Sequence, residues 1–255
     1  MVFSMDKWMG KIAIITGASS GIGAAIADAL VEEGLTVVGV ARRSERIEKR
    51  AKQLSTKKGK LYSFKADVTK EDDVLKVFEW TKNNLGIVHV LINNAGKGAG
   101  NNLTEGKTEE WKSVLDLNVL ALCTMTREAV KVMKENKING HIIHINSIFG
   151  HRVYDIPNVN VYPASKHAIT ALSETLRHEL KHQGLKIKVT SISPGLVESE
   201  LTTLNENITP ERKLYLESRA ILKGEDIADG VVYVLSTPEH VQIEELTIRP
   251  IGEMF

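Results

Sequence analysis

Several features that would restrict this protein to particular classes are scarce or absent in the sequence. Its 255 residues include one cysteine, Cys123, so no internal disulfide can form and a reducing compartment fits best. No stretch reaches the run of about 18 apolar residues that a membrane-spanning helix needs. The first ten residues do not read as a secretory signal. We therefore expect a cytoplasmic protein without a transmembrane segment.

The sequence also has no large excess of positive or negative charge. The net charge is +1 and no block of basic residues occurs, so nucleic-acid binding is not expected. His141 and His144 are close in sequence but lie on opposite faces of one predicted strand, and no cysteine or acid completes a set of metal ligands. We therefore predict no metal site, and Cys123 is interpreted as a buried small apolar residue.

Short apolar runs rich in valine and isoleucine alternate with longer segments of helical period. Such runs, with little polar alternation, suit strands that are covered on both faces. The predicted strands are 11–16, 36–40, 61–66, 88–92, 141–145, 188–192 and 242–249. The predicted helices are 23–33, 45–54, 71–84, 109–135, 164–183 and 226–236. This alternation predicts a single α/β domain over residues 1–255, with a doubly wound, mainly parallel seven-stranded sheet and helices on both faces, a Rossmann fold.

One segment, about 193–219, has no clear period and carries prolines and many charges. A long irregular insert in a compact domain is often functional, so we interpret it as a lid over the substrate. Its apolar residues Leu196, Leu201, Leu204 and Tyr215 suggest an apolar substrate, or else simply pack the lid onto the domain.

The first predicted strand runs into a glycine-rich turn that opens a helix. Gly17, Gly21 and Gly23 have the spacing G-x-x-x-G-x-G. Glycines at such a turn let the backbone approach a pyrophosphate, and the helix start supplies N–H groups and positive dipole. A purely structural turn is the alternative, but the position after the first strand favours a dinucleotide site.

The residues that end the next strands indicate which dinucleotide binds. A ribose-binding acid is missing after the second strand, where Arg42 and Arg43 stand instead and suit the 2′-phosphate of NADP. The alternative is that both arginines are simply solvated. Asp67 ends the third strand, where it would meet the adenine edge. The run 93–96, Asn-Asn-Ala-Gly, ends the fourth strand near the cofactor, although either feature could be ordinary turn chemistry.

The fifth strand leads into Ser147, and fifteen residues later Tyr162 opens a helix with Lys166 one turn further on. A tyrosine has an ordinary pKa of about 10, and a nearby ammonium favours its phenolate form. Tyr162 is therefore a candidate acid–base group, with Ser147 holding the substrate oxygen. By itself the Tyr-x-x-x-Lys spacing is more often a solvated helix face.

Taken together, these motifs resemble the short-chain dehydrogenase/reductase family. The matching segments, in the family's order over about residues 10–200, are 16–23, 93–96, Asn118, Ser147, Tyr162 with Lys166, and Pro194-Gly195. The resemblance implies a catalytic tetrad of Asn118, Ser147, Tyr162 and Lys166, with Asn118 serving a proton relay to Lys166. It implies a homodimer or homotetramer built through the two long helices. The implied cofactor-binding residues are Gly17, Ser19, Ser20, Gly21, Ile22, Gly23, Arg42, Arg43, Asp67, Val68, Asn94, Ala95, Gly96, Tyr162, Lys166, Pro194, Gly195, Val197 and Ser199.

Two features depart from the family pattern or narrow it. Ser199 stands where the family often has a threonine, and the C-terminus lacks the glycine-rich ending of many members. Together, the C-terminal segment 243–250 and the segments 41–43 and 150–153 resemble the group of insect farnesol dehydrogenases and their steroid-active vertebrate relatives. The resemblance thus implies NADP(H)-dependent hydride transfer to or from an apolar alcohol or carbonyl such as farnesol. Ketosteroid or general carbonyl reduction is the alternative, and a non-catalytic NADP-binding protein a remote one.

Overall fold

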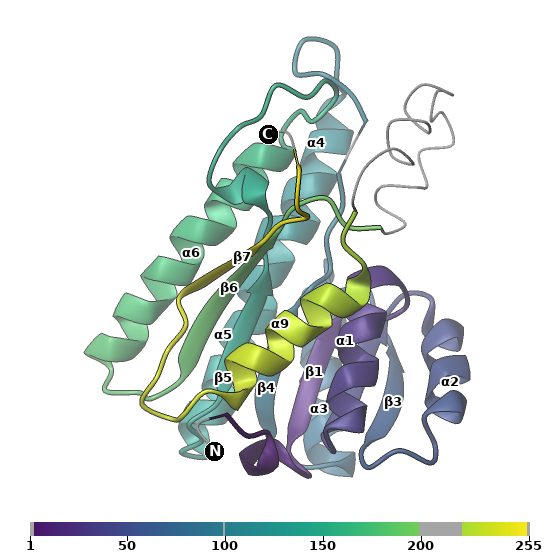
Figure 1. The fold of residues 1–255 in the computed structure, drawn as a ribbon, viewed down its shortest axis with the longest axis vertical. Coiled ribbons are helices and arrows are strands. Elements are labelled where there is room, and N and C mark those ends of the chain that lie inside the picture. Colours follow the sequence, from purple (N-terminus) through teal and green to yellow (C-terminus); the bar gives the residue numbers. More distant parts are fainter. Residues whose placement is uncertain (1–2, 99, 199–220, 254–255) are drawn as a thin grey trace.

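The computed structural model describes residues 3–98, 100–198 and 221–253. Its centre is one parallel sheet of seven strands in the order β3-β2-β1-β4-β5-β6-β7 (Figure 1). The strands are β1 (Ile12–Thr16), β2 (Thr36–Ala41), β3 (Lys60–Lys65), β4 (Val88–Asn93), β5 (His141–Ile145), β6 (Lys188–Pro194) and β7 (Glu245–Ile248). The order reverses between β1 and β4, and at such a point the carboxyl ends of parallel strands leave a crevice for a ligand.

Helices cover both faces of this sheet, as the sequence predicted (Figure 1). They are α1 (Gly21–Glu32), α2 (Ser44–Gln53), α3 (Glu71–Asn84), α4 (Thr108–Leu115), α5 (Ala121–Glu135), α6 (Tyr162–His182) and α9 (Gly224–Ser236). Two hydrophobic cores result, one under α1, α2 and α9, the other under α3, α5 and α6. In β1, Ala13 and Ile15 belong to the first core and Ile12 and Ile14 to the second. Because successive strand residues face opposite cores, both faces demand apolar side chains and the sequence shows an unbroken run.

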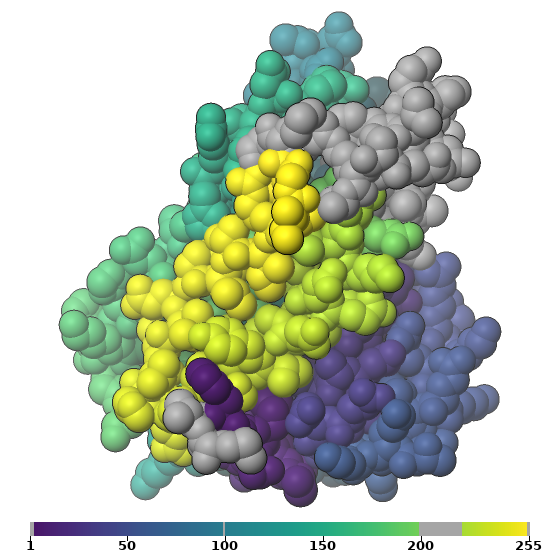
Figure 2. Space-filling view, viewed as in Figure 1, coloured from purple at the N-terminus to yellow at the C-terminus, as the bar shows by residue number. Residues whose placement is uncertain are grey.

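The last strand does not follow that rule. The sequence predicted a strand over 242–249 that is covered on both faces, but β7 has four residues, and its Glu245 and Thr247 are exposed. It pairs with β6 and lies at the edge of the sheet, so one side of its backbone has no strand neighbour among the described residues. Figure 2 shows the chain after α9, in yellow, running across the surface beside that helix. The prediction for β7 was wrong in length and burial for this reason.

The helix predicted over 109–135 is interrupted at its middle. A π-helical turn, Asp116–Leu120, separates α4 from α5. A π turn inserts one residue into the helical repeat and is frequent at functional sites. Cys123, on α5, is half-buried rather than fully buried, which corrects the sequence interpretation.

Parts of two sequence predictions fall outside the described residues. The insert at 193–219 is described only to residue 198, so Ser199, Leu201, Leu204 and Tyr215 lie outside the described residues. Within the described ranges, no helix has both the length and the apolar character needed to cross a membrane.

Candidate active site

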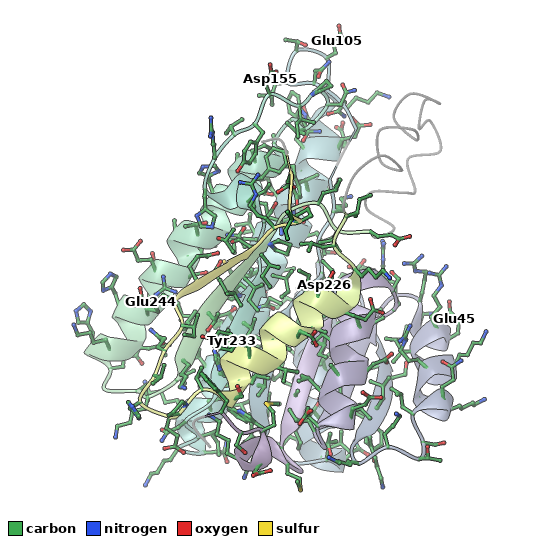
Figure 3. All side chains as sticks on the ribbon, in the orientation of Figure 1. Glu45, Glu105, Asp155, Asp226, Tyr233 and Glu244 are labelled. Carbon is green, nitrogen blue, oxygen red and sulfur yellow. The ribbon has the colours of Figure 1, made fainter. Side chains whose placement is uncertain are left out.

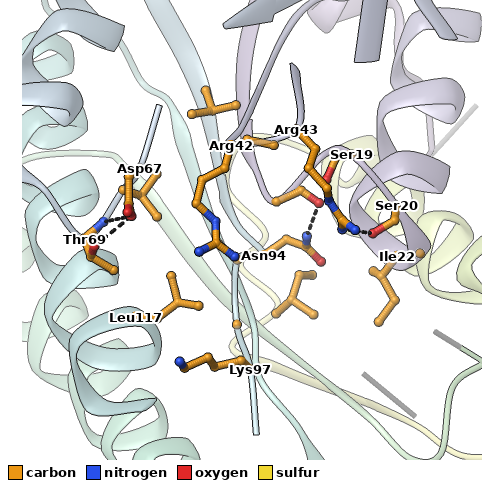
Figure 4. Close-up of a pocket in the computed structure, with 18 of the residues that line it drawn as sticks. Ser19, Ser20, Ile22, Arg42, Arg43, Asp67, Thr69, Asn94, Lys97 and Leu117 are labelled. Carbon is orange, nitrogen blue, oxygen red and sulfur yellow. Dashed lines mark hydrogen bonds between the residues drawn. The ribbon is translucent and has the colours of Figure 1, made fainter. Parts of the chain in front are cut away.

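A cleft of about 460 Å³ opens at the carboxyl ends of the strands, between the ends of β1 and β4 (Figure 4). Its size falls within the usual range for small-molecule sites. It is lined by Gly17, Ser19, Ser20, Gly21, Ile22, Val40, Ala41, Arg42, Arg43, Ala66, Asp67, Val68, Thr69, Asn94, Ala95, Gly96, Lys97, Ser113, Asp116, Leu117, Ile145, Asn146, Tyr162 and Lys166. Residues far apart in the sequence therefore meet in a single hollow.

The glycine-rich turn at one side of the cleft is tightly built. Gly17 and Gly21 have φ values of +70° and +53°, in the left-handed region that favours glycine. A Cβ at Gly23 would lie 2.3 Å from Nδ2 of Asn94 and 2.5 Å from the Gly17 carbonyl oxygen. Gly23 does not line the cleft, so its lack of a side chain serves packing of the turn. The hydroxyl of Ser20 accepts a hydrogen bond from Arg43 at 3.3 Å and does not cap α1.

The end of β4 is bound to the end of β1 by hydrogen bonds. Oγ1 of Thr16 accepts from the backbone N–H groups of Asn94 and Ala95, both at 3.0 Å. Nδ2 of Asn94 donates to the Thr16 carbonyl oxygen at 2.9 Å. The sequence assigned Asn94 to cofactor binding, and in the structure its side chain also holds the two strand ends at the spacing that forms the cleft.

Arginines and one carboxylate occupy the side of the cleft formed by β2 and β3. Arg42 is exposed and extends between Asp67 and Arg43 in Figure 4. Partial burial acts to raise the pKa of Asp67, but hydrogen bonds from Thr69 and the charge of Arg42 together hold that pKa below its ordinary value. The Asp67 carboxylate accepts from Oγ1 of Thr69 at 2.7 Å. This side therefore offers two guanidinium groups and one ionised acid.

Tyr162 and Lys166 lie together at the opposite side. Nζ of Lys166 is 5.7 Å from the centre of the Tyr162 ring and donates to the Ile145 carbonyl oxygen at 3.0 Å. Burial lowers the pKa of Lys166 to about 8. Burial raises the pKa of Tyr162 to about 12, against the opposing effect of a hydrogen bond with Ser147. The sequence led us to expect that the ammonium lowers the pKa of Tyr162, but in this structure burial raises that pKa and the opposing effect comes from Ser147.

Asn118 lies in the π turn, buried behind the cleft. Its Oδ1 accepts from the Lys97 N–H at 2.9 Å, and its Nδ2 donates to the Lys97 carbonyl oxygen at 2.9 Å and to Oγ of Ser165 at 3.0 Å. A Cβ at Gly96 would lie 3.4 Å from Oδ1 of Asn118 and 4.0 Å from Nζ of Lys166. Asn118 thus fixes the backbone after β4, and Gly96 keeps the space between Asn118 and Lys166 open.

The structure brings most of the sequence-predicted residues together, but not all. Six of them are described yet do not line the cleft: Gly23, Asn118, Ser147, Pro194, Gly195 and Val197. Sequence reasoning missed the other residues that line it: Val40, Ala41, Ala66, Thr69, Lys97, Ser113, Asp116, Leu117, Ile145 and Asn146. For most of them the available sequence signal is that they lie next to a predicted residue, as Lys97 follows Gly96 and Leu117 precedes Asn118, whereas Ser113 has no such neighbour. Among the described residues, no group of three His, Cys, Asp or Glu side chains is arranged to hold a metal ion.

Comparisons with known proteins agree with this architecture. The family description "short chain dehydrogenase" matches residues 11–210. Farnesol dehydrogenase of Aedes aegypti is 48% identical over 253 residues, covering 98% of this chain and 100% of the relative. Dehydrogenase/reductase SDR family member 11 of Homo sapiens is 43% identical over 250 residues, covering 96% of each chain.

Two solved structures extend the likeness to three dimensions. An alcohol dehydrogenase from Thermococcus sibiricus complexed with 5-hydroxy-NADP is 29% identical, with a TM-score of 0.83 and 95% and 97% of the two chains covered. The closed form of serine dehydrogenase complexed with NADP+ is 27% identical, with a TM-score of 0.86 and 96% of each chain covered.

Proposed function

The chain belongs to the short-chain dehydrogenase/reductase family, and from that premise we propose that it is an NADP(H)-dependent oxidoreductase acting on an apolar alcohol/carbonyl pair. The observation that carries the proposal is the meeting of Tyr162 and Lys166 with the glycine-rich turn in a single cleft. A protein that only binds the nucleotide would need the turn but not a half-buried tyrosine beside a buried lysine. We therefore favour an enzyme over a non-catalytic NADP-binding protein.

The residues that line the cleft suit a nicotinamide dinucleotide. Left-handed glycines and the start of α1 suit a diphosphate, because they allow close backbone approach beside free helical N–H groups. Arg42 and Arg43 suit the 2′-phosphate that distinguishes NADP from NAD. Two structural relatives were solved with NADP or a derivative of it, which supports the same cofactor here. When bound, the cofactor supplies the hydride that is transferred.

The side chains at the other end of the cleft suit proton transfer. With a pKa of about 12, Tyr162 is protonated near neutral pH and ready to donate its proton to a carbonyl oxygen as it is reduced. Ser147, hydrogen-bonded to Tyr162, would hold the same substrate oxygen. The Lys166 ammonium would stabilise the charge left on the tyrosine, and Asn118 would position the backbone beside it. These four residues are the proposed catalytic set.

Carbonyl reduction is expected to weaken as pH rises through about 8. Lys166 has its pKa lowered to about 8 by burial, so its ammonium is lost above that pH, whereas Tyr162 stays protonated up to about 12. The measurement is kcat/KM for NADPH-dependent reduction from about pH 6 to pH 10, because the pH dependence of kcat/KM reports the pKa values of the free enzyme. A Lys166→Met variant should be slow and lack the step near pH 8. If wild-type activity were flat through that pH, or if the variant kept the same step, the role of Lys166 would be wrong.

Farnesol is the first substrate to test, because of the Aedes aegypti relative's name. Aromatic rings beside Tyr162 also favour an apolar substrate, since Phe149 packs 5.8 Å from the Tyr162 ring centre and 5.4 Å from that of Tyr154. We expect farnesol and farnesal to be turned over faster than a ketosteroid or a small dicarbonyl when measured side by side with NADP(H). Faster turnover of the ketosteroid or the dicarbonyl would favour the alternative substrate class. NADPH binding without turnover of any substrate would favour a non-catalytic NADP-binding protein. A homodimer or homotetramer, and a cytoplasmic location, stay predictions.

A further inference from the structure

The C-terminal tail returns to the carboxyl edge of the sheet, close to the segment that follows β6. β7 runs parallel to β6, with Ile248 in register with Pro194. The N–H of Gly195 then donates to the Ile248 carbonyl oxygen at 2.8 Å. After β7 the chain turns, and the Glu253 N–H donates to the Pro250 carbonyl oxygen at 3.3 Å. The turn brings the side chain of Glu253 back over the end of β6.

Glu253 is almost completely enclosed although it is an acid near the end of the chain. Its side chain is 3% exposed. One carboxylate oxygen accepts a hydrogen bond from the Leu196 N–H at 2.9 Å, and the other pairs with Nε of Arg249 at 2.6 Å. A buried carboxylate is costly unless both oxygens are paired, and here both are. The carboxylate is therefore held in one place by partners on two sides.

The same carboxylate explains why residue 195 is glycine. Gly195 does not have a left-handed φ, so its backbone conformation does not require glycine. A Cβ there would lie 2.6 Å and 2.8 Å from the two carboxylate oxygens of Glu253, closer than real Cβ atoms approach. A Cβ at 195 would displace the Glu253 carboxylate from its hydrogen bonds with Leu196 and Arg249, so glycine at 195 leaves room for that side chain.

The segment from Pro194 to Glu198 is also held on its other side. The Leu222 N–H donates to the Leu196 carbonyl oxygen at 3.0 Å, and the Glu198 N–H donates to the Leu222 carbonyl oxygen at 2.8 Å. Leu196 is thus bound at its N–H by Glu253 and at its carbonyl by Leu222. Loss of Glu253 would release the N–H side while the pairing with Leu222 remains.

We propose that Glu253 is a positioning residue, which holds Gly195 and Leu196 in the geometry that the nicotinamide end of the cofactor requires. The inference rests on the proposed function and on the family resemblance, which implies Pro194, Gly195 and Val197 as cofactor-binding residues. None of the three lines the cleft, but β6 pairs with β5, whose last residue Ile145 does line it. Glu253 itself does not line the cleft. Its effect is therefore expected in the placement of the reacting ring, and the 2′-phosphate end near Arg42 should bind as before.

The first experiment compares Glu253→Ala and Glu253→Gln with Glu244→Ala as a matched control. Glu244 is exposed on the stretch before β7 and points outward in Figure 3. Glu253→Ala should lower kcat by about tenfold with the NADPH Kd within about twofold of wild type, because small misplacements of reacting groups cost rate. Glu253→Gln keeps an acceptor for the Leu196 N–H and should recover most of kcat. Glu244→Ala should match wild type. A wild-type kcat in folded Glu253→Ala would overturn the proposal.

The second experiment needs no turnover. Hydrogen exchange at the Leu196 amide should accelerate at least about tenfold in Glu253→Ala and remain slow in Glu253→Gln and Glu244→Ala. Gly195→Ala should mimic the loss of kcat, and combining it with Glu253→Ala should cost no more than the worse single change. Unchanged exchange, or fully additive kinetic losses, would refute the positioning role. If the wild type bound NADPH without turnover, the proposed function would fail, while the exchange result would still confirm or refute the contact with Leu196.

Discussion

Replacing Tyr162 with phenylalanine is expected to lower kcat for carbonyl reduction by about 10³-fold, the usual scale for loss of a positioned acid–base group. The change removes the hydroxyl and leaves the ring, which keeps its edge-to-face contact with Phe149. The fold and the cleft should therefore survive. Initial rates with NADPH and the best substrate of the panel give kcat, and NADPH fluorescence gives the cofactor Kd, which we expect to stay within about threefold of wild type.

Tyr154→Phe provides the matched control for that experiment. Tyr154 packs against the same Phe149 ring, at 5.4 Å, so the control removes a hydroxyl from the neighbouring tyrosine and keeps its ring. It should retain nearly full kcat. If Tyr162→Phe kept more than about a tenth of wild-type kcat, or if both variants lost activity equally, proton transfer by Tyr162 could not be maintained.

Replacing Arg42 and Arg43 together with glutamine is expected to raise the Kd for NADPH by about 100-fold. Hydrogen bonds to charged groups contribute about 1.5–3 kcal/mol each, and about 1.4 kcal/mol corresponds to a factor of ten. Both residues line the cleft, and Arg42 is exposed, so part of its contribution is screened by solvent. The Kd for NADH should change by less than about threefold, because NADH has no 2′-phosphate. Isothermal titration with both cofactors measures the two constants.

The single variants and a control make this test specific. Arg43 also donates to Ser20, so Arg43→Gln is expected to disturb the glycine-rich turn slightly and to weaken NADH binding more than Arg42→Gln does. Lys49→Gln, an exposed change on α2, should leave both constants unchanged. Equal weakening of NADPH and NADH in the double variant would mean that the arginines support the turn and do not recognise the 2′-phosphate. An unchanged NADPH Kd in the double variant would mean that Arg42 and Arg43 do not bind the cofactor.

Most of the fold could be predicted from the sequence, because every position of a parallel strand that is covered on both faces requires an apolar side chain. Residues 12–15 are all buried apolar residues, with alternate members in opposite cores, so the apolar run is visible without an alignment. The edge strand β7 was misjudged for the converse reason, because its exposed Glu245 and Thr247 follow from its place in the sheet. The interruption at Asn118 was missed because the sequence over 109–135 has no proline or glycine, the usual local signs that a helix is broken, while the π turn inserts only one residue.

In the candidate site, too, local sequence features could be predicted and contacts between distant segments could not. Glycines, the two arginines and the Tyr-x-x-x-Lys spacing are local features, so the sequence alone determined the family resemblance, the parallel α/β sheet and the end of the sheet where the cleft lies. Contacts between distant segments are not local. Only the tertiary structure decided that burial raises the pKa of Tyr162, that Gly23 makes room for Asn94, and that Gly195 makes room for Glu253. These properties depend on which atoms come within a few ångströms after folding, and separation along the chain does not encode that distance.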